Sequence, residues 1–286
     1  MTTAAFDPVA FKNTQRVNWN AISSGWLSCE ADFESGGAPV TARLLELGGV
    51  RAGQRVLDIG TGTGQPALTA AAVVGPAGRV VGIDLAPEMI ALAADRAPAN
   101  AEFRVGDADS MEFPDASFDV VLSRWGLMFA VDRTALFRTV ERVLTRGGVL
   151  AAAVWAEPAA APMMSLGYRV LAERLELPTG PAGAPGPFSM ADPDLIAAEL
   201  AEAGFAEVSV QLYEVPFLVE SPGRYAEFNK VVSPPGLKDK IRERFGSVDD
   251  APTWAAVGAA VEPYRRPDGR VALPSTTLLL RAVANG

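Results

Sequence analysis

The 286-residue sequence contains no histidine, and its one cysteine is Cys29. Without histidine, a Ser-His-Asp triad, an imidazole general base and an imidazole zinc site are all excluded. One cysteine also excludes an internal disulfide framework and a cysteine metal cluster. If the chemistry of this protein requires a base, that base is a carboxylate, a tyrosine, a lysine or water.

Basic residues are also scarce, because 25 lysines and arginines face 34 acidic residues, for a net charge of −9. This balance disfavours nucleic acid as a partner, since a polyanion is bound by clustered basic side chains. No apolar run approaches the roughly 20 residues of a membrane span, and MTTAAFDP lacks the segments of a signal peptide. We therefore expect a cytoplasmic monomer or homodimer that acts on a small molecule, with no membrane partner.

The most informative stretch is RVLDIGTGTGQPALTAAAVVGPAGRVVGIDL, residues 55–85. Apolar residues at 56, 57 and 59 predict a buried parallel strand, which a glycine-rich loop at 60–64 follows. A helix to residue 74 and a second apolar strand at 80–83 come next, and that strand ends on Asp84. This order is typical of the nucleoside-binding half of a doubly wound fold.

Two carboxylates indicate which nucleoside this unit binds. Asp84 lies about twenty residues after the loop, where a carboxylate accepts hydrogen bonds from a ribose diol. Asp58 stands two residues before Gly60, where it would repel a pyrophosphate and attract a cationic ligand. The loop is also G-x-G-x-G and not the dinucleotide fingerprint, so a nicotinamide oxidoreductase is the third choice.

At these residues the sequence resembles a known family. LDIGTGTG and VVGIDLAPEMI resemble motifs I and II of the class I S-adenosylmethionine-dependent methyltransferases, and GDADSMEFPDASFD is similar to their motif III region. The resemblance is closest to the ubiquinone/menaquinone C-methyltransferase-like branch, and it implies S-adenosyl-L-methionine as the cofactor. The cofactor-binding residues expected from the carboxylates and the resemblance are Asp58, Gly60, Thr61, Gly62, Gly64, Asp84, Leu85, Met89, Asp107, Ala108 and Ser123. The alternatives are a crossover whose glycines only make a tight turn, and an Asp107 that bonds its own turn.

Strands and helices alternate along the chain, which predicts an α/β fold with a doubly wound, Rossmann-like, mostly parallel sheet. Further strands are expected at 102–105, 118–122, 149–155, 208–213 and 273–284, for about seven in all. The helices expected outside the glycine-rich unit span 8–22, 39–47, 87–97, 134–144, 163–177 and 193–203. The resemblance implies an antiparallel last strand and a helical cap.

The expected organisation has three parts. N-terminal helices at 1–52 close the pocket, and 53–157, 192–220 and 272–286 form the cofactor-binding core. Residues 158–191 and 221–271 form the cap and substrate region, with a loop or hinge at 178–187.

The residues after the strand at 118–122 bear on the reaction. The sequence Ser123-Arg124-Trp125-Gly126 lacks the (Asn/Asp)-Pro-Pro-(Tyr/Phe) motif of nucleobase amino-methyltransferases and the metal-binding aspartate of catechol-type enzymes, so no metal is expected. Arg124 either holds the cofactor carboxylate or an anionic substrate group, or pairs with a carboxylate such as Asp132. The expected substrate pocket contains Trp19, Trp26, Arg124, Trp125, Met128, Phe129 and Met163. For Trp19 and Trp26, packing of a peripheral helix is an equal alternative.

These apolar residues favour an aromatic or lipophilic acceptor that is methylated on oxygen or carbon by in-line displacement, mainly through positioning. The candidate bases are Tyr168, Tyr213, Tyr225 and Glu227, none of which is singled out by its spacing. The alternative function is a methyltransferase fold that binds the cofactor but catalyses another reaction, such as a cyclisation, because fold does not imply function.

Overall fold

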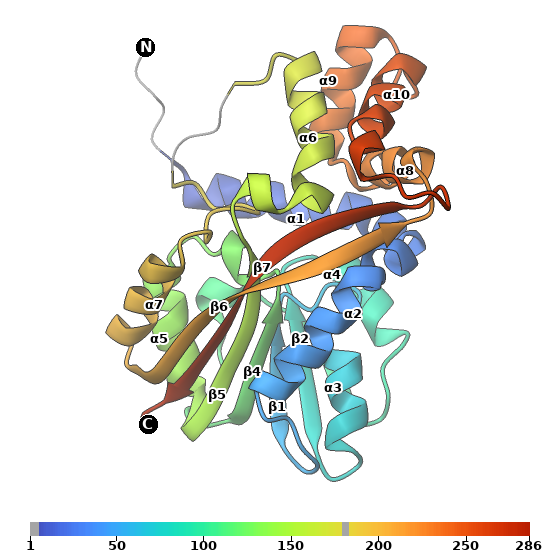
Figure 1. Ribbon diagram of the computed structural model, residues 1–286. Coiled ribbons are helices and arrows are strands. Elements are labelled where there is room, and N and C mark those ends of the chain that lie inside the picture. Colours follow the sequence, from blue (N-terminus) through green and yellow to red (C-terminus); the bar gives the residue numbers. More distant parts are fainter. Residues whose placement is uncertain (1–5, 179–182) are drawn as a thin grey trace.

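A seven-stranded sheet with the strand order β3-β2-β1-β4-β5-β7-β6 forms the centre of the computed structural model, which describes residues 6–178 and 183–286 (Figure 1). The strands are β1 Arg55–Ile59, β2 Arg79–Asp84, β3 Ala101–Val105, β4 Phe118–Arg124, β5 Leu144–Trp155, β6 Phe205–Val219 and β7 Val271–Ala284. Strands β1 to β5 run parallel, and β7 is antiparallel to both β5 and β6. The predicted doubly wound sheet with an antiparallel last strand is therefore confirmed.

Helices cover both faces of this sheet and extend beyond one end of it. The helices are α1 Pro8–Ser28, α2 Glu30–Leu47, α3 Ala67–Val74, α4 Pro87–Ala94, α5 Arg133–Val143, α6 Pro162–Arg174, α7 Pro193–Glu202, α8 Pro222–Val232, α9 Pro235–Phe245 and α10 Ala251–Ala259. Figure 1 shows α2, α3 and α4 on one side of the sheet and α5 and α7 on the other. Helices α6, α8, α9 and α10 gather above α1, which crosses the end of the sheet (Figure 1).

The first helix begins where the sequence predicts, because Asp7 caps it by accepting hydrogen bonds from the backbone N–H groups of Val9 and Ala10. Its end was predicted too early, since α1 continues to Ser28. No helix in the described ranges combines the length and apolar character that a bilayer crossing requires.

The second helix starts nine residues before the predicted position, at Glu30. Gly36 and Gly37 lie inside α2 and do not end it. Their lack of a side chain lets the helix pack closely against Phe217 and Arg124. A Cβ on Gly36 would lie 2.7 Å from the ring of Phe217, and one on Gly37 would lie 2.8 Å from Nη1 of Arg124. These glycines therefore bring α2 against the sheet and the residues at its end.

Two strands are longer than their apolar patterns predict. Strand β5 begins at Leu144, directly after α5, so residues 144–148 are in a strand and do not form a helix stop. Strand β6 covers residues 205–219 because it pairs with β7 as far as Val219 opposite Val271. Strand β6 lies at the edge of the sheet and needs few apolar residues on its solvent side. The alternation of apolar and polar residues in the sequence therefore marks only part of this strand. The predicted loop at 178–187 includes residues 179–182, which lie outside the described residues.

Candidate functional site

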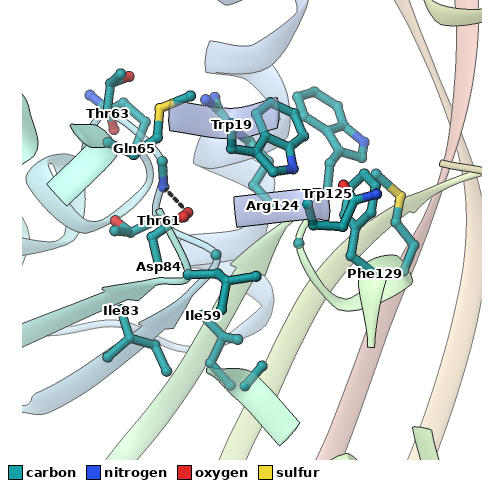
Figure 2. A pocket seen from close by; sticks show the side chains of 18 of the residues that line it. Trp19, Ile59, Thr61, Thr63, Gln65, Ile83, Asp84, Arg124, Trp125 and Phe129 are labelled. Carbon is teal, nitrogen blue, oxygen red and sulfur yellow. Dashed lines mark hydrogen bonds between the residues drawn. The ribbon is translucent and has the colours of Figure 1, made fainter. Parts of the chain in front are cut away.

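A cavity lies at the carboxyl ends of β1, β2 and β4, beneath α1 and α2. Figure 2 shows Asp84 and Thr61 on one side of it and Trp125 and Phe129 on the other. Fourteen of the predicted site residues line this cavity: Trp19, Trp26, Gly60, Thr61, Gly62, Asp84, Leu85, Met89, Asp107, Ala108, Arg124, Trp125, Met128 and Phe129.

Three other predicted residues face away from the cavity. Gly64 faces α3, where an added Cβ would lie 2.8 Å from Leu68. Ser123 is fully buried, and its Oγ donates a hydrogen bond to a backbone carbonyl of β1 at 2.7 Å. Met163 is also buried, and its neighbour Met164 lines the cavity instead. At these three positions the sequence located the right segment but not which of its residues face the cavity.

Asp58 lies beneath the glycine loop and does not line the cavity. Its side chain is fully buried, and Oδ2 accepts a hydrogen bond from the backbone N–H of Ala67 at 3.1 Å. The expected direct contact with a ligand is therefore not supported. Burial raises the pKa of Asp58 to about 7, while the nearby Thr61 hydroxyl and the Ala67 N–H oppose that rise.

The raised pKa of Asp58 predicts a pH-dependent stability. The folded protein retains this proton up to about pH 7, whereas an unfolded aspartate loses it near pH 4. The contribution of Asp58 to stability is therefore present at low pH and is lost as the pH rises from about 4 to 7. Urea unfolding at pH 5 and pH 8 should show that Asp58→Asn gains about 3 kcal/mol relative to the unmodified protein over this interval. If the free energy of unfolding depended on pH in the same way in both proteins, the raised pKa of Asp58 would be wrong.

Asp84 ends β2 with its carboxylate at the cavity. Oδ2 accepts a hydrogen bond from the backbone N–H of Gly62 and Oδ1 accepts one from that of Ala86, both at 2.9 Å. Burial raises the pKa of Asp84, and these backbone N–H groups oppose the rise. Gly62 has φ +54°, and an added Cβ would meet no atom within 4 Å. The loop is thus fixed by Asp84 and open toward the cavity.

Asp107 has a partner that lies far away in the sequence. Nζ of Lys12 in α1 is 2.6 Å from Oδ1 of Asp107 and 2.6 Å from Oδ2 of Asp109. Asp107 also accepts a hydrogen bond from the backbone N–H of Asp109 at 3.0 Å, as a turn residue does. The ion pairs of Lys12 therefore hold α1 over this part of the cavity.

Aromatic rings form the opposite wall. Trp19 meets Phe129 edge-on at 5.8 Å between ring centroids, and Trp26 meets Phe33 at 4.8 Å. All four residues line the cavity. Edge-on and tilted contacts of this kind are favourable beyond their buried area. The two α1 tryptophans therefore line the cavity as well as contacting other aromatic rings.

Trp125 has an unusual backbone conformation within this wall. It has φ +61°, a region that costs a bulky residue about 1–3 kcal/mol and is found mostly at functional sites. Its ring is parallel to that of Trp155 within 3°, with centroids 4.4 Å apart. Its Nε1 donates a hydrogen bond to Oγ1 of Thr277 at 3.1 Å. These contacts hold the indole at the cavity.

Arg124 forms an ion pair, but not with Asp132. Its Nη1 lies 3.0 Å from Oε2 of Glu34 and donates a second hydrogen bond to Oγ1 of Thr41 at 2.9 Å. Asp132 instead caps α5 by accepting a hydrogen bond from the backbone N–H of Ala135. The ion-pair alternative is therefore the observed arrangement, with a different partner.

Several cavity residues were not predicted from the sequence: Lys12, Glu30, Phe33, Glu34, Trp155 and Met164. Glu30, Phe33 and Glu34 are spaced three and four residues apart, so they lie on one face of α2. A prediction that α2 begins at Glu30 would therefore have grouped these three residues. Lys12 and Trp155 carry no comparable local signal.

Part of the chain is similar to known proteins. Residues 57–152 match a family model described as a methyltransferase domain. A ubiquinone/menaquinone biosynthesis C-methyltransferase of Pseudomonas putida is 40% identical over 119 residues, which are 40% of this chain and 46% of that protein. The chain thus matches about half the length of this relative.

Solved structures with the same fold cover more of the chain. Phosphoethanolamine N-methyltransferase 2 of Haemonchus contortus, in complex with S-adenosyl-L-methionine, aligns with a TM-score of 0.61 at 20% identity, over 99% of this chain and 61% of that one. The cyclase SpnF aligns with a TM-score of 0.51 at 24% identity, over 87% of this chain and 82% of that one. At these identities the two structures support the fold alone.

Proposed function

We propose that the chain binds S-adenosyl-L-methionine in the cavity and methylates a small acceptor, because residues 57–152 match a methyltransferase domain model and part of the chain resembles a ubiquinone/menaquinone biosynthesis C-methyltransferase. The acceptor is aromatic or lipophilic, and the methyl group goes to oxygen or carbon. The observation that carries this proposal is the position of Asp84, whose carboxylate reaches the cavity beside the open face of Gly62.

The lining of the cavity fits the cofactor. Each oxygen of Asp84 accepts one backbone hydrogen bond and has a second lone pair for a ribose hydroxyl. Leu85 and Met89, from the loop after β2 and from α4, offer an apolar surface for the base. The open side of Gly62 permits close approach of a ligand to the backbone. We assign Gly60, Thr61, Asp107 and Ala108 to the same cofactor site.

The aromatic wall supports an apolar acceptor. Rings of Trp19, Trp26, Phe33, Trp125 and Phe129 face this side of the cavity. Glu34 and Thr41 engage the guanidinium of Arg124, so an anionic acceptor would compete with an existing carboxylate partner. We therefore propose an acceptor without a negative charge at this wall. We also propose that α1, α6, α8, α9 and α10 form the substrate cap.

When bound, S-adenosyl-L-methionine supplies the electrophilic methyl group and its own leaving group. The remaining task of the protein is to orient the acceptor and exclude water, which the aromatic side chains and α1 perform. Tyr225 is unsuited to act as a base: it is fully buried, its hydroxyl accepts a hydrogen bond from the backbone N–H of Gly167 at 2.9 Å, and burial raises its pKa to about 12. Among the described residues, Tyr168, Tyr213 and Glu227 do not line the cavity. None of the four candidate bases therefore lines the cavity.

Calorimetric titration with S-adenosyl-L-methionine and S-adenosylhomocysteine tests the cofactor. We expect both to bind and to stabilise the fold by about 2.7 kcal/mol at one hundred times Kd, while NAD has no effect. Incubation with methyl-labelled cofactor and a panel of phenols and quinols should then transfer the label. Binding without transfer to any acceptor would favour the cyclisation-type alternative, and a preference for a small charged acceptor such as glycine would reject the proposed substrate class.

A further inference from the structure

The first turn of α2 places a carboxylate at the edge of the glycine loop. Glu30 lines the cavity, and its Oε1 and Oε2 lie 2.7 Å and 3.0 Å from Nη1 and Nη2 of Arg96. Nη1 of Arg96 also donates a hydrogen bond to the backbone carbonyl of Thr63 at 3.2 Å, and Oγ1 of Thr63 is 3.4 Å from Oε1 of Glu30. The ion pair is thereby attached to the loop itself.

Local structure favours both charges at these positions. Glu30 is the first residue of α2, where a negative charge interacts favourably with the positive end of the helix dipole. Arg96 follows the end of α4 by two residues, where the helix dipole favours a positive charge. The fold thus holds a bidentate carboxylate–guanidinium pair at the cavity, a geometry that fixes the orientation of the carboxylate.

The position of Glu30 in the cavity indicates which part of the cofactor it faces. This step rests on the proposed function, in which Asp84 holds the ribose and Leu85 and Met89 border the base. The amino acid tail of the cofactor would then lie further along the glycine loop, where Thr63 lines the cavity with Glu30 beside it. That part of the cofactor is an amino acid, which carries an ammonium and a carboxylate.

We propose that Glu30 binds the ammonium group of the methionine tail, and that Arg96 is the residue that positions it. A carboxylate has about four lone-pair positions, and the two N–H groups of Arg96 and the hydroxyl of Thr63 use three of them. The remaining one accepts an N–H group of an ammonium, which makes a charge-assisted hydrogen bond. Glu30 therefore selects ligands that carry the amino acid tail.

Three related ligands test this role by calorimetry: S-adenosyl-L-methionine, S-adenosylhomocysteine and 5′-methylthioadenosine, which has the nucleoside and the sulfur but no amino acid tail. Glu30→Gln should raise Kd for the first two by about ten- to one-hundredfold, the usual effect of losing a hydrogen bond to a charged group. Kd for 5′-methylthioadenosine should change less than about threefold. A residue that only supports the loop would weaken all three ligands together, and that result would overturn the proposal.

Two further variants separate the possible outcomes. Asp32→Asn removes another carboxylate of α2, which pairs with Arg224 at 2.6 Å and does not line the cavity, and it should leave all three affinities unchanged. Glu30→Gln leaves the charge of Arg96 without its carboxylate partner. The double variant Glu30→Gln/Arg96→Gln removes that charge and should still show the loss of affinity for the two ligands with the amino acid tail. Unchanged binding of all three ligands to Glu30→Gln would refute this inference and leave the proposed function intact. If the unmodified protein bound none of them, the proposed function itself would fail.

Discussion

Replacing Asp84 with alanine is expected to raise Kd for S-adenosyl-L-methionine at least one-hundredfold. The substitution removes both acceptors proposed for the ribose diol, and a hydrogen bond to a charged group contributes about 1.5–3 kcal/mol. It also leaves the backbone N–H groups of Gly62 and Ala86 without their acceptor, so the loop loses the contact that fixes it. Calorimetric titration of the purified variant measures the effect directly.

A carboxylate at the opposite end of the sheet provides the control. Asp119, near the start of β4, accepts a hydrogen bond from the backbone N–H of Arg55 at 2.8 Å, as Asp84 does from that of Gly62. Asp119→Ala should therefore lower the free energy of unfolding without changing cofactor affinity. If Asp84→Ala bound the cofactor as tightly as the control, the assignment of Asp84 to the ribose would be wrong.

Replacing Trp155 with alanine is expected to lower the free energy of unfolding by about 3–5 kcal/mol, the usual cost of removing a large buried aromatic side chain. Trp155 is 1% exposed and stacks on Trp125 at 4.4 Å between centroids. The deletion therefore creates a cavity in the core and removes the ring that supports the aromatic wall. Urea unfolding at constant pH measures the change.

The same experiment on Leu212→Ala gives the baseline, because Leu212 is 71% exposed on the edge strand β6. Its free energy of unfolding should change by less than about 0.5 kcal/mol. A loss below about 1 kcal/mol for Trp155→Ala would mean that the wall repacks around the missing ring. An aromatic wall that repacks in this way would be too adaptable to select acceptors by their shape.

The side of the cavity formed by the glycine loop and Asp84 was predictable because its geometry is local. The strand at 55–59, the glycine loop and Asp84 belong to one unit of about thirty residues, in which hydrogen bonds connect near neighbours. Apolar runs fix the strands, and glycine permits the positive φ values of the loop. This unit therefore predicted its parallel pair of strands and the position of Asp84 without knowledge of the remaining chain. It did not predict the direction of Asp58, which faces the start of α3 instead of the cavity.

Tertiary structure alone decided which distant side chains complete the cavity. Lys12 meets Asp107 across 95 residues of sequence, Arg124 meets Glu34 across 90 and Arg96 meets Glu30 across 66. Such pairs form because α1 and α2 pack over the end of the sheet. No local pattern specifies the partner, since each charged residue is equally compatible with a solvated surface. By itself the sequence determined the fold and the glycine loop, whose interactions are short-range. The aromatic wall and the ion pairs around it depend on packing between elements far apart in the chain.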